Sequence, residues 1–174
     1  MNIKGIDSLM KKLTELGGNA DKVLETSIAK QTKLVQGEAK DLCPVDTGDL
    51  RQSIFTYVKA SKGTVIGTVF TNIEHASYVE FGTGKKGEAS GGDKYPGPLA
   101  YKQDKWLANI PDVGLRWIEG QPAQPFLYPA LKNNEDIVIQ GIKRDFRKAI
   151  REISNKWLML RIKCLMHLKT YVKM

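Results

Sequence analysis

The sequence is poor in the residues on which disulfide scaffolds, metal sites and many active sites depend. Its 174 residues include two cysteines, Cys43 and Cys164, and two histidines, His75 and His167. A disulfide framework or a zinc site normally needs more of these residues at close spacing. We therefore expect two free thiols in a reducing compartment, no metal and no cofactor.

Long apolar runs are also missing. No stretch of eighteen apolar residues occurs, so we expect no membrane-spanning helix and no membrane partner. The first residues lack the charged-then-apolar pattern of a secretion signal. The length suits one domain with a single core and at most one appendage.

Positive charge is in excess, and it is concentrated at one end. The formal net charge is +8, and residues 143–174 alone contain ten Lys or Arg against two acids. Residues 1–142 are balanced. A basic end can bind nucleic acid, an acidic protein surface or a membrane face, and charge alone does not choose among them.

Apolar spacing predicts two helices before Pro44. Residues 6–16 form a short amphipathic helix, and a helix of about twenty residues follows, with Asn19 or Asp21 available as its N-cap. Pro44 ends the second helix, because the residue before proline is disfavoured in the α region.

A capped turn and a hairpin are expected next. Asp46, Thr47 and Gly48 suit a turn that leads into one helical turn at residues 49–53. Two runs rich in β-branched and aromatic residues then predict a hairpin whose turn is Lys62-Gly63. These runs are Ile54–Val58 and Thr64–Thr71, and a further strand is expected at Tyr78–Phe81.

A long polar stretch follows, from Lys85 to about Gln121. It contains Trp106 and Trp117, which flexible linkers rarely carry. Loops of this length are usually functional, so over residues 85–120 we expect a mobile arm that becomes ordered, or partly helical around residues 99–109, in an assembly.

The last part of the chain predicts a second long helix. It begins at Pro129, which suits a first helical position because no N–H is needed there, and its apolar stripe reaches Ile153. Residues 154–174 form a basic amphipathic helix beyond it. The predicted fold is α+β: a small antiparallel sheet packed by a long N-terminal and a long C-terminal helix, with residues 1–153 as one domain and an extra C-terminal basic helix.

Catalytic chemistry is weakly indicated. Asp46, Asp49 and Glu80 could gather into a metal or acid–base site, but Asp46 and Asp49 occupy typical capping positions. His75 lies beside Glu74 in a polar turn, and no nucleophile motif surrounds any Ser or Cys. The glycines near Lys85 lack the spacing of a phosphate loop. We predict that the protein is not an enzyme.

Four blocks of sequence, in their order and spacing, resemble the tail-component or neck morphogenesis (tail completion, head–tail joining) proteins of long-tailed bacteriophages and prophages. The blocks are residues 43–54, 78–84, 121–127 and 129–131. The resemblance covers roughly residues 1–153, and residues 156–174 fall outside it.

The resemblance implies a structural virion protein at the head–tail junction, present in the host cytoplasm during assembly. It implies a ring of copies, with a hexamer expected, that contacts neck or connector proteins on one side and a tail terminator or tail tube protein on the other. It transfers no catalytic residues. The matched positions are expected to define the fold: Pro44, Asp46, Thr47, Gly48, Leu50, Ser53, Tyr78, Glu80, Phe81, Gly82, Pro125, Phe126 and Pro129.

Candidate interface residues lie outside these blocks. They are Trp106 and Trp117 in the arm and Trp157, Arg161 and Lys163 in the basic tail. The tail either extends the last helix and docks on an acidic neighbour, which we favour because its apolar stripe needs burial, or makes non-specific contact with DNA in the conduit. The main alternative function is a basic DNA-binding accessory protein, although no DNA-binding motif is recognisable. A small hydrolase or toxin is the third class, and would need a clustered acid–base site.

Overall fold

A computed structural model describes residues 5–15, 18–61, 64–91, 95 and 97–171, with side chains described as far as Met159. The described residues divide into two compact units. The helical unit comprises those within Met1–Gln31, Val58–Gly67 and Asp136–Met174. The motif unit comprises those within Thr32–Tyr57 and Thr68–Glu135, and all four sequence blocks lie in it.

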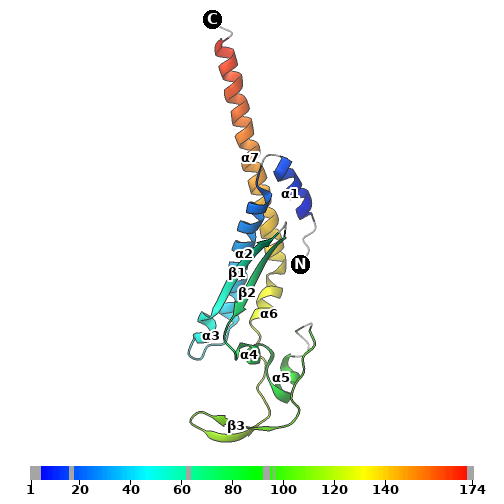
Figure 1. Cartoon of the computed structure of the whole chain (residues 1–174), viewed down its shortest axis with the longest axis vertical. Helices are drawn as coiled ribbons and strands as arrows, with labels where there is room; N and C mark the ends of the chain where they lie inside the picture. Colours follow the sequence, from blue (N-terminus) through cyan, green and yellow to red (C-terminus); the bar gives the residue numbers. More distant parts are fainter. Residues whose placement is uncertain (1–4, 16–17, 62–63, 92–94, 96, 172–174) are drawn as a thin grey trace. The chain divides into compact units, whose positions relative to one another are not determined.

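The helical unit packs three helices around one apolar core. Helix α1 is Ile6–Glu15, α2 is Ala20–Leu42 and α7 is Glu135–Tyr171, and the three lie side by side in Figure 1. The buried residues at the centre of the core are Leu13, Ala20, Ile142 and Phe146. Partly buried neighbours at helical spacing complete it: Ile6, Leu9, Met10, Val23, Leu24, Ile28, Val138, Ala149, Ile150 and Ile153. The apolar stripes predicted from the sequence are therefore the faces that meet.

Capping and a buried polar contact fix how these helices begin and pair. The Lys22 backbone N–H donates to Asn19 Oδ1 at 2.9 Å, so Asn19 caps α2 as predicted. Ser27 in α2 donates from its hydroxyl to Asp145 Oδ2 in α7 at 2.8 Å. Because Ser27 is only 2% exposed, its hydroxyl has little access to water, and this bond both satisfies the hydroxyl and joins the two helices.

The motif unit is a succession of short elements. They are α3 (Asp49–Gln52), β1 (Ile54–Ser61), β2 (Thr64–Thr71), α4 (Ala76–Phe81), α5 (Gly84–Gly91), β3 (Trp106–Ile110), β4 (Gly114–Ile118) and α6 (Leu127–Asn133), with the far ends of β1 and β2 in the helical unit. Strands β1 and β2 form one two-stranded sheet, and β3 pairs with β4 in an antiparallel second sheet. The buried apolar residues of the motif unit include Val35, Ala39, Leu50, Ile54, Ala76, Phe126 and Ala130.

The α+β class and the terminal helices predicted from the sequence are confirmed. The hairpin is also present, although its predicted turn, Lys62-Gly63, lies outside the described residues. The boundary of a single domain at residue 153 stays a prediction.

The strand expected at Tyr78–Phe81 was a wrong prediction, because these residues form helix α4. Their aromatic and β-branched side chains favour strands only when a neighbouring strand is available. Here the backbone N–H groups of Tyr78 and Val79 donate instead to the His75 carbonyl, at 3.0 and 3.1 Å. The helical turn directs Glu80 inward, where it is 5% exposed.

The expectation of a helix around residues 99–109 inside a long loop was also wrong. Helix α5 occupies the start of this segment, and a β-hairpin occupies its second half, with Trp106 opposite Ile118 and Ile110 opposite Gly114. Asp112 and Gly114 both have positive φ, at 63° and 83°, which the tight turn between the strands requires.

The second long helix begins later than expected. Pro129 lies in the first turn of the short helix α6, where its missing N–H costs nothing, and α7 begins only at Glu135. Asn134 separates the two helices, and its side-chain amide donates to the Ala130 carbonyl at 2.9 Å. From Glu135 the helix runs without interruption to Tyr171, so the basic tail is an extension of α7 rather than an extra helix.

Candidate functional site

Two of the sequence blocks meet at Glu80. One carboxylate oxygen of Glu80 accepts the backbone N–H groups of Phe126 and Leu127, at 2.7 and 2.9 Å, and the other accepts that of Tyr128 at 2.8 Å. These are the free N–H groups at the start of α6. A buried carboxylate is costly unless it is fully hydrogen-bonded, and three charge-assisted bonds meet that requirement.

The glycine-containing segment after Glu80 pairs with the same stretch of chain. Thr83 and Gln121 exchange two backbone hydrogen bonds, at 2.9 and 3.1 Å. Gly82 has φ 73° and ψ −177°, a conformation essentially limited to glycine, and a Cβ there would lie 2.7 Å from the Ala123 nitrogen. We call this arrangement, Glu80–Gly84 against Gln121–Tyr128, the clasp.

The first block forms a separate capped turn. The Thr47 hydroxyl donates to the Asp49 carboxylate at 2.8 Å, and Gly48 has φ +91°. Ser53 donates to the Leu50 carbonyl at 2.8 Å and shares a 2.6 Å hydrogen bond with the Thr71 hydroxyl of β2. The block therefore connects the end of α2 to the first sheet.

Charges of the turn and of the clasp both act on the pKa of Cys43. Burial raises the pKa of the Cys43 thiol; the Arg51 guanidinium lowers that pKa in part, and the Glu80 carboxylate raises it further. Cys43 is a free thiol and is buried, so it stays protonated and poorly reactive near neutral pH. The side chain of Cys164 lies outside the described part of α7.

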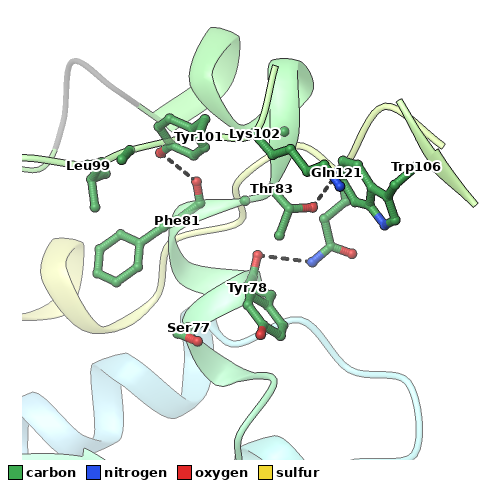
Figure 2. A pocket seen from close by; sticks show the side chains of 12 residues that line it. Ser77, Tyr78, Phe81, Thr83, Leu99, Tyr101, Lys102, Trp106 and Gln121 are labelled. Atoms are coloured by element: carbon green, nitrogen blue, oxygen red, sulfur yellow. Dashed lines mark hydrogen bonds between the residues drawn. The ribbon is translucent and has the colours of Figure 1, made fainter. Parts of the chain in front are cut away.

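An aromatic cleft of about 730 Å³ lies beside the clasp (Figure 2). Its walls include Tyr78 and Phe81 from α4, Tyr101 from the following loop and Trp106 from β3. The Tyr101 hydroxyl donates to the Phe81 carbonyl at 2.9 Å, and the Gln121 amide donates to the Tyr78 carbonyl at the same distance. These bonds hold the walls in place, so the cleft is formed in advance of any occupant.

Lys102 brings a positive charge to this cleft. Its Nζ lies 5.4 Å from the centre of the Trp106 ring, within the range of a cation–π interaction. The pocket thus combines flat aromatic surface with one cation and an amide. Such a lining suits an aromatic or aliphatic side chain accompanied by a negative charge.

The β3–β4 hairpin exposes one apolar face. Leu107 lies opposite Trp117 and Asn109 opposite Leu115, so these four residues share a face. Leu107 is 49% exposed, Leu115 68% and Trp117 69%. We call this surface the hairpin face. At its base Lys105 and Glu119 form an ion pair of 2.7 Å, which also lowers the pKa of the Glu119 carboxyl.

The predicted interface residues occupy different places. Trp117 is on the hairpin face, whereas Trp106 is half-buried and lines the cleft. Trp157 is exposed on α7 beside the exposed Leu158 and Met159. Arg161 and Lys163 belong to the same helix, but their side chains lie outside the described residues.

Two of the three acidic residues that could have formed a catalytic centre, Glu80 and Asp49, have structural contacts. Glu80 accepts three backbone N–H groups, and Asp49 accepts the Thr47 hydroxyl. Within the described part of the chain, no group of three His, Cys, Asp or Glu residues is placed to hold a metal ion. No helix there has the length and apolarity needed to cross a membrane.

The clasp contacts and the cleft do not follow from the sequence pattern. Because the sequence predicts Glu80 on a strand, it gives no indication of the contact with α6. Leu107 and Leu115 lie in a segment that the sequence predicts to be a loop, so their shared face was not predicted. The alternation of apolar residues around Pro111-Asp112, typical of a hairpin, was the available signal.

Residues 7–82 match the protein family described as "Bacteriophage HK97-gp10, putative tail-component". The match confirms the resemblance to phage tail components that the sequence indicated. It includes the first block and most of the second, while the blocks at residues 121–131 lie beyond it. No curated protein and no solved structure matches the chain.

Proposed function

We propose, from the match of residues 7–82 to a family of phage tail components, that this protein is a structural part of a tailed-phage or prophage virion. In this proposal, copies of the chain assemble into a ring that completes the tail and joins it to the head. The ring contacts neck or connector proteins on one side and a tail terminator or tail tube protein on the other.

The observation that carries the assembly proposal is the hairpin face. A two-stranded hairpin is marginal in water unless it packs against something, and this one leaves Leu107, Leu115 and Trp117 exposed. Exposed apolar patches of this kind mark interaction surfaces. A closed ring buries such surfaces on every copy without leaving open ends, and a hexamer is the expected form.

A non-enzymatic role agrees with how the carboxylates are used. Glu80 and Asp49 are engaged in capping and turn contacts, which makes them unsuited to acid–base chemistry. The family is one of structural tail components. The proposed location is the neck or tail of the virion, after assembly in the host cytoplasm.

Helix α7 supports a second candidate role, contact with DNA in the conduit of the particle. Arg144, Arg147, Lys148, Arg151 and Lys156 are exposed along it. Such contact would be independent of sequence and would weaken steeply as salt rises. Binding of the purified protein to duplex DNA, measured between roughly 50 and 200 mM salt, tests this role against the alternative of a dedicated DNA-binding accessory protein.

Electron microscopy of virions carrying a labelled copy of this protein tests the main proposal. A ring of label between head and tail is the expected result, and its symmetry would give the copy number. Particles that lack the protein, or that contain it along the whole tail, would contradict the head–tail joining role.

A further inference from the structure

The cleft and the hairpin face lie on opposite sides of the same hairpin. Trp106 lines the cleft and pairs with Ile118. Successive residues of a strand point to opposite faces, so Leu107 and its partner Trp117 lie on the side away from the cleft. One chain therefore presents an aromatic hollow on one side and apolar side chains on the other.

Such an arrangement specifies how copies can associate. When the complementary surfaces are different parts of one chain, contact is head to tail, and repetition gives a closed ring or an open filament. A contact that paired the same surface twice would give a two-fold dimer instead. The two sides of this hairpin thus supply both halves of a head-to-tail contact.

The charges near the cleft and near the tip of the hairpin are also complementary. Lys102 gives the cleft lining a positive charge, and Asp112 in the turn of the hairpin is exposed and negative. Lys105, at the base of the hairpin face, is already paired with Glu119 and so does not oppose Lys102. Arg116 pairs with Ala108 and lies on the other face.

We propose that the hairpin face of one copy docks in the aromatic cleft of the next copy, with Trp117 as the anchor and Asp112 close to Lys102. This inference rests on the proposed ring and deepens it by naming both contacting surfaces. The cavity of about 730 Å³ is large enough for the Trp117 side chain and a neighbour from the same face.

Analytical ultracentrifugation of the full chain tests the anchor. Trp117→Ala should weaken self-association about 30-fold, the scale of an interface hot spot. The matched control is Tyr57→Ala, which removes an exposed aromatic side chain of β1, outside both the cleft and the hairpin face, and should leave association unchanged. Circular dichroism should show both variants folded, since each replaced side chain is more than half exposed.

A charge exchange tests the partner surface. Asp112→Lys and Lys102→Glu should each weaken association by about threefold, and the double variant should recover most of that loss. Lys33→Glu makes the same charge change on an exposed residue of α2 and should have no effect. Failure of the double variant to recover would contradict the Asp112–Lys102 proximity.

Cysteine pairing tests the contact directly, in a Cys164→Ser background. Differently tagged copies carrying Leu107→Cys and Ser77→Cys should form a mixed disulfide under mild oxidation, because Ser77 lines the cleft. The control pair replaces Ser77 by Val45→Cys, exposed outside the cleft, and should remain reduced.

The outcomes separate this inference from the proposed function. If the protein assembles, but Trp117→Ala does not weaken association and the cysteine pair forms no disulfide, the proposed docking surfaces are wrong and the ring proposal stands. If the wild type stays monomeric at every accessible concentration and the Leu107→Cys and Ser77→Cys copies form no cross-link in particles, the docking is overturned. Absence of the protein from particles would overturn the proposed function itself.

Discussion

The clasp and the β3–β4 hairpin are neighbours in the motif unit, yet they place charged and apolar side chains in opposite environments. In the clasp, the charged Glu80 is buried and all three of its hydrogen bonds are to backbone of the same chain. In the hairpin, the apolar Leu115 and Trp117 are exposed. In this unit, residues of the four sequence blocks build the subunit, while residues outside the blocks form the surface that we propose meets neighbouring copies.

Among the substitutions that test this comparison, Glu80→Ala should reduce the stability of the protein the most. It removes three charge-assisted hydrogen bonds and leaves the N–H groups of Phe126, Leu127 and Tyr128 without their acceptor, so we expect a loss of about 4 kcal/mol in the free energy of unfolding. Urea denaturation measures it. Glu80→Gln keeps the size and one acceptor and should cost about half as much; equal stability of both variants and the wild type would show that the clasp is not stabilising.

Gly82→Ala should come next, at about 3 kcal/mol. The conformation of Gly82 strains any other residue, and the new Cβ would meet the backbone at Ala123. Gly37→Ala is the matched control, because Gly37 lies within α2 with open space around it, and there alanine should stabilise the helix by about 1 kcal/mol. Thermal unfolding of both variants distinguishes them by the sign of the shift.

Ser53→Ala should cost about 1 kcal/mol. It removes a buried hydroxyl that bonds the Leu50 carbonyl and the Thr71 hydroxyl, but the change leaves no charge unpaired. Ser77→Ala provides the comparison, since its hydroxyl makes an exposed 3.2 Å contact with Glu74 and should matter little. Chemical denaturation of the two variants would contradict this account if Ser77→Ala proved the more harmful.

Leu115→Ser should have the smallest effect on the folded subunit, below about 0.5 kcal/mol, because the side chain is already 68% exposed. The variant should nevertheless remain soluble at higher concentration than the wild type, as measured by light scattering, because it exposes less apolar area on the hairpin face. A large loss of stability would show that this face is part of the subunit's own core.

Local rules predicted much of this protein correctly. Asn19 was recognised as a possible cap, and the stripes containing Leu13 and Phe146 form the core of the helical unit. Those signals depend on residues a few positions apart, so they can be recognised in a single sequence. The strand predicted at Tyr78–Phe81 failed because its alternative partner, the start of α6, lies more than forty residues away.

The opening helix, the two long helices, the first hairpin, the capped turn at Thr47 and the concentration of positive charge along α7 all follow from spacing or composition within a short window of sequence. The capping of α6 by Glu80, the placement of Trp106 and Trp117 on opposite sides of a hairpin, and the aromatic cleft depend instead on long-range contacts. The physical reason is that a buried carboxylate, a glycine in close contact and a cleft wall are all defined by what distant segments bring beside them.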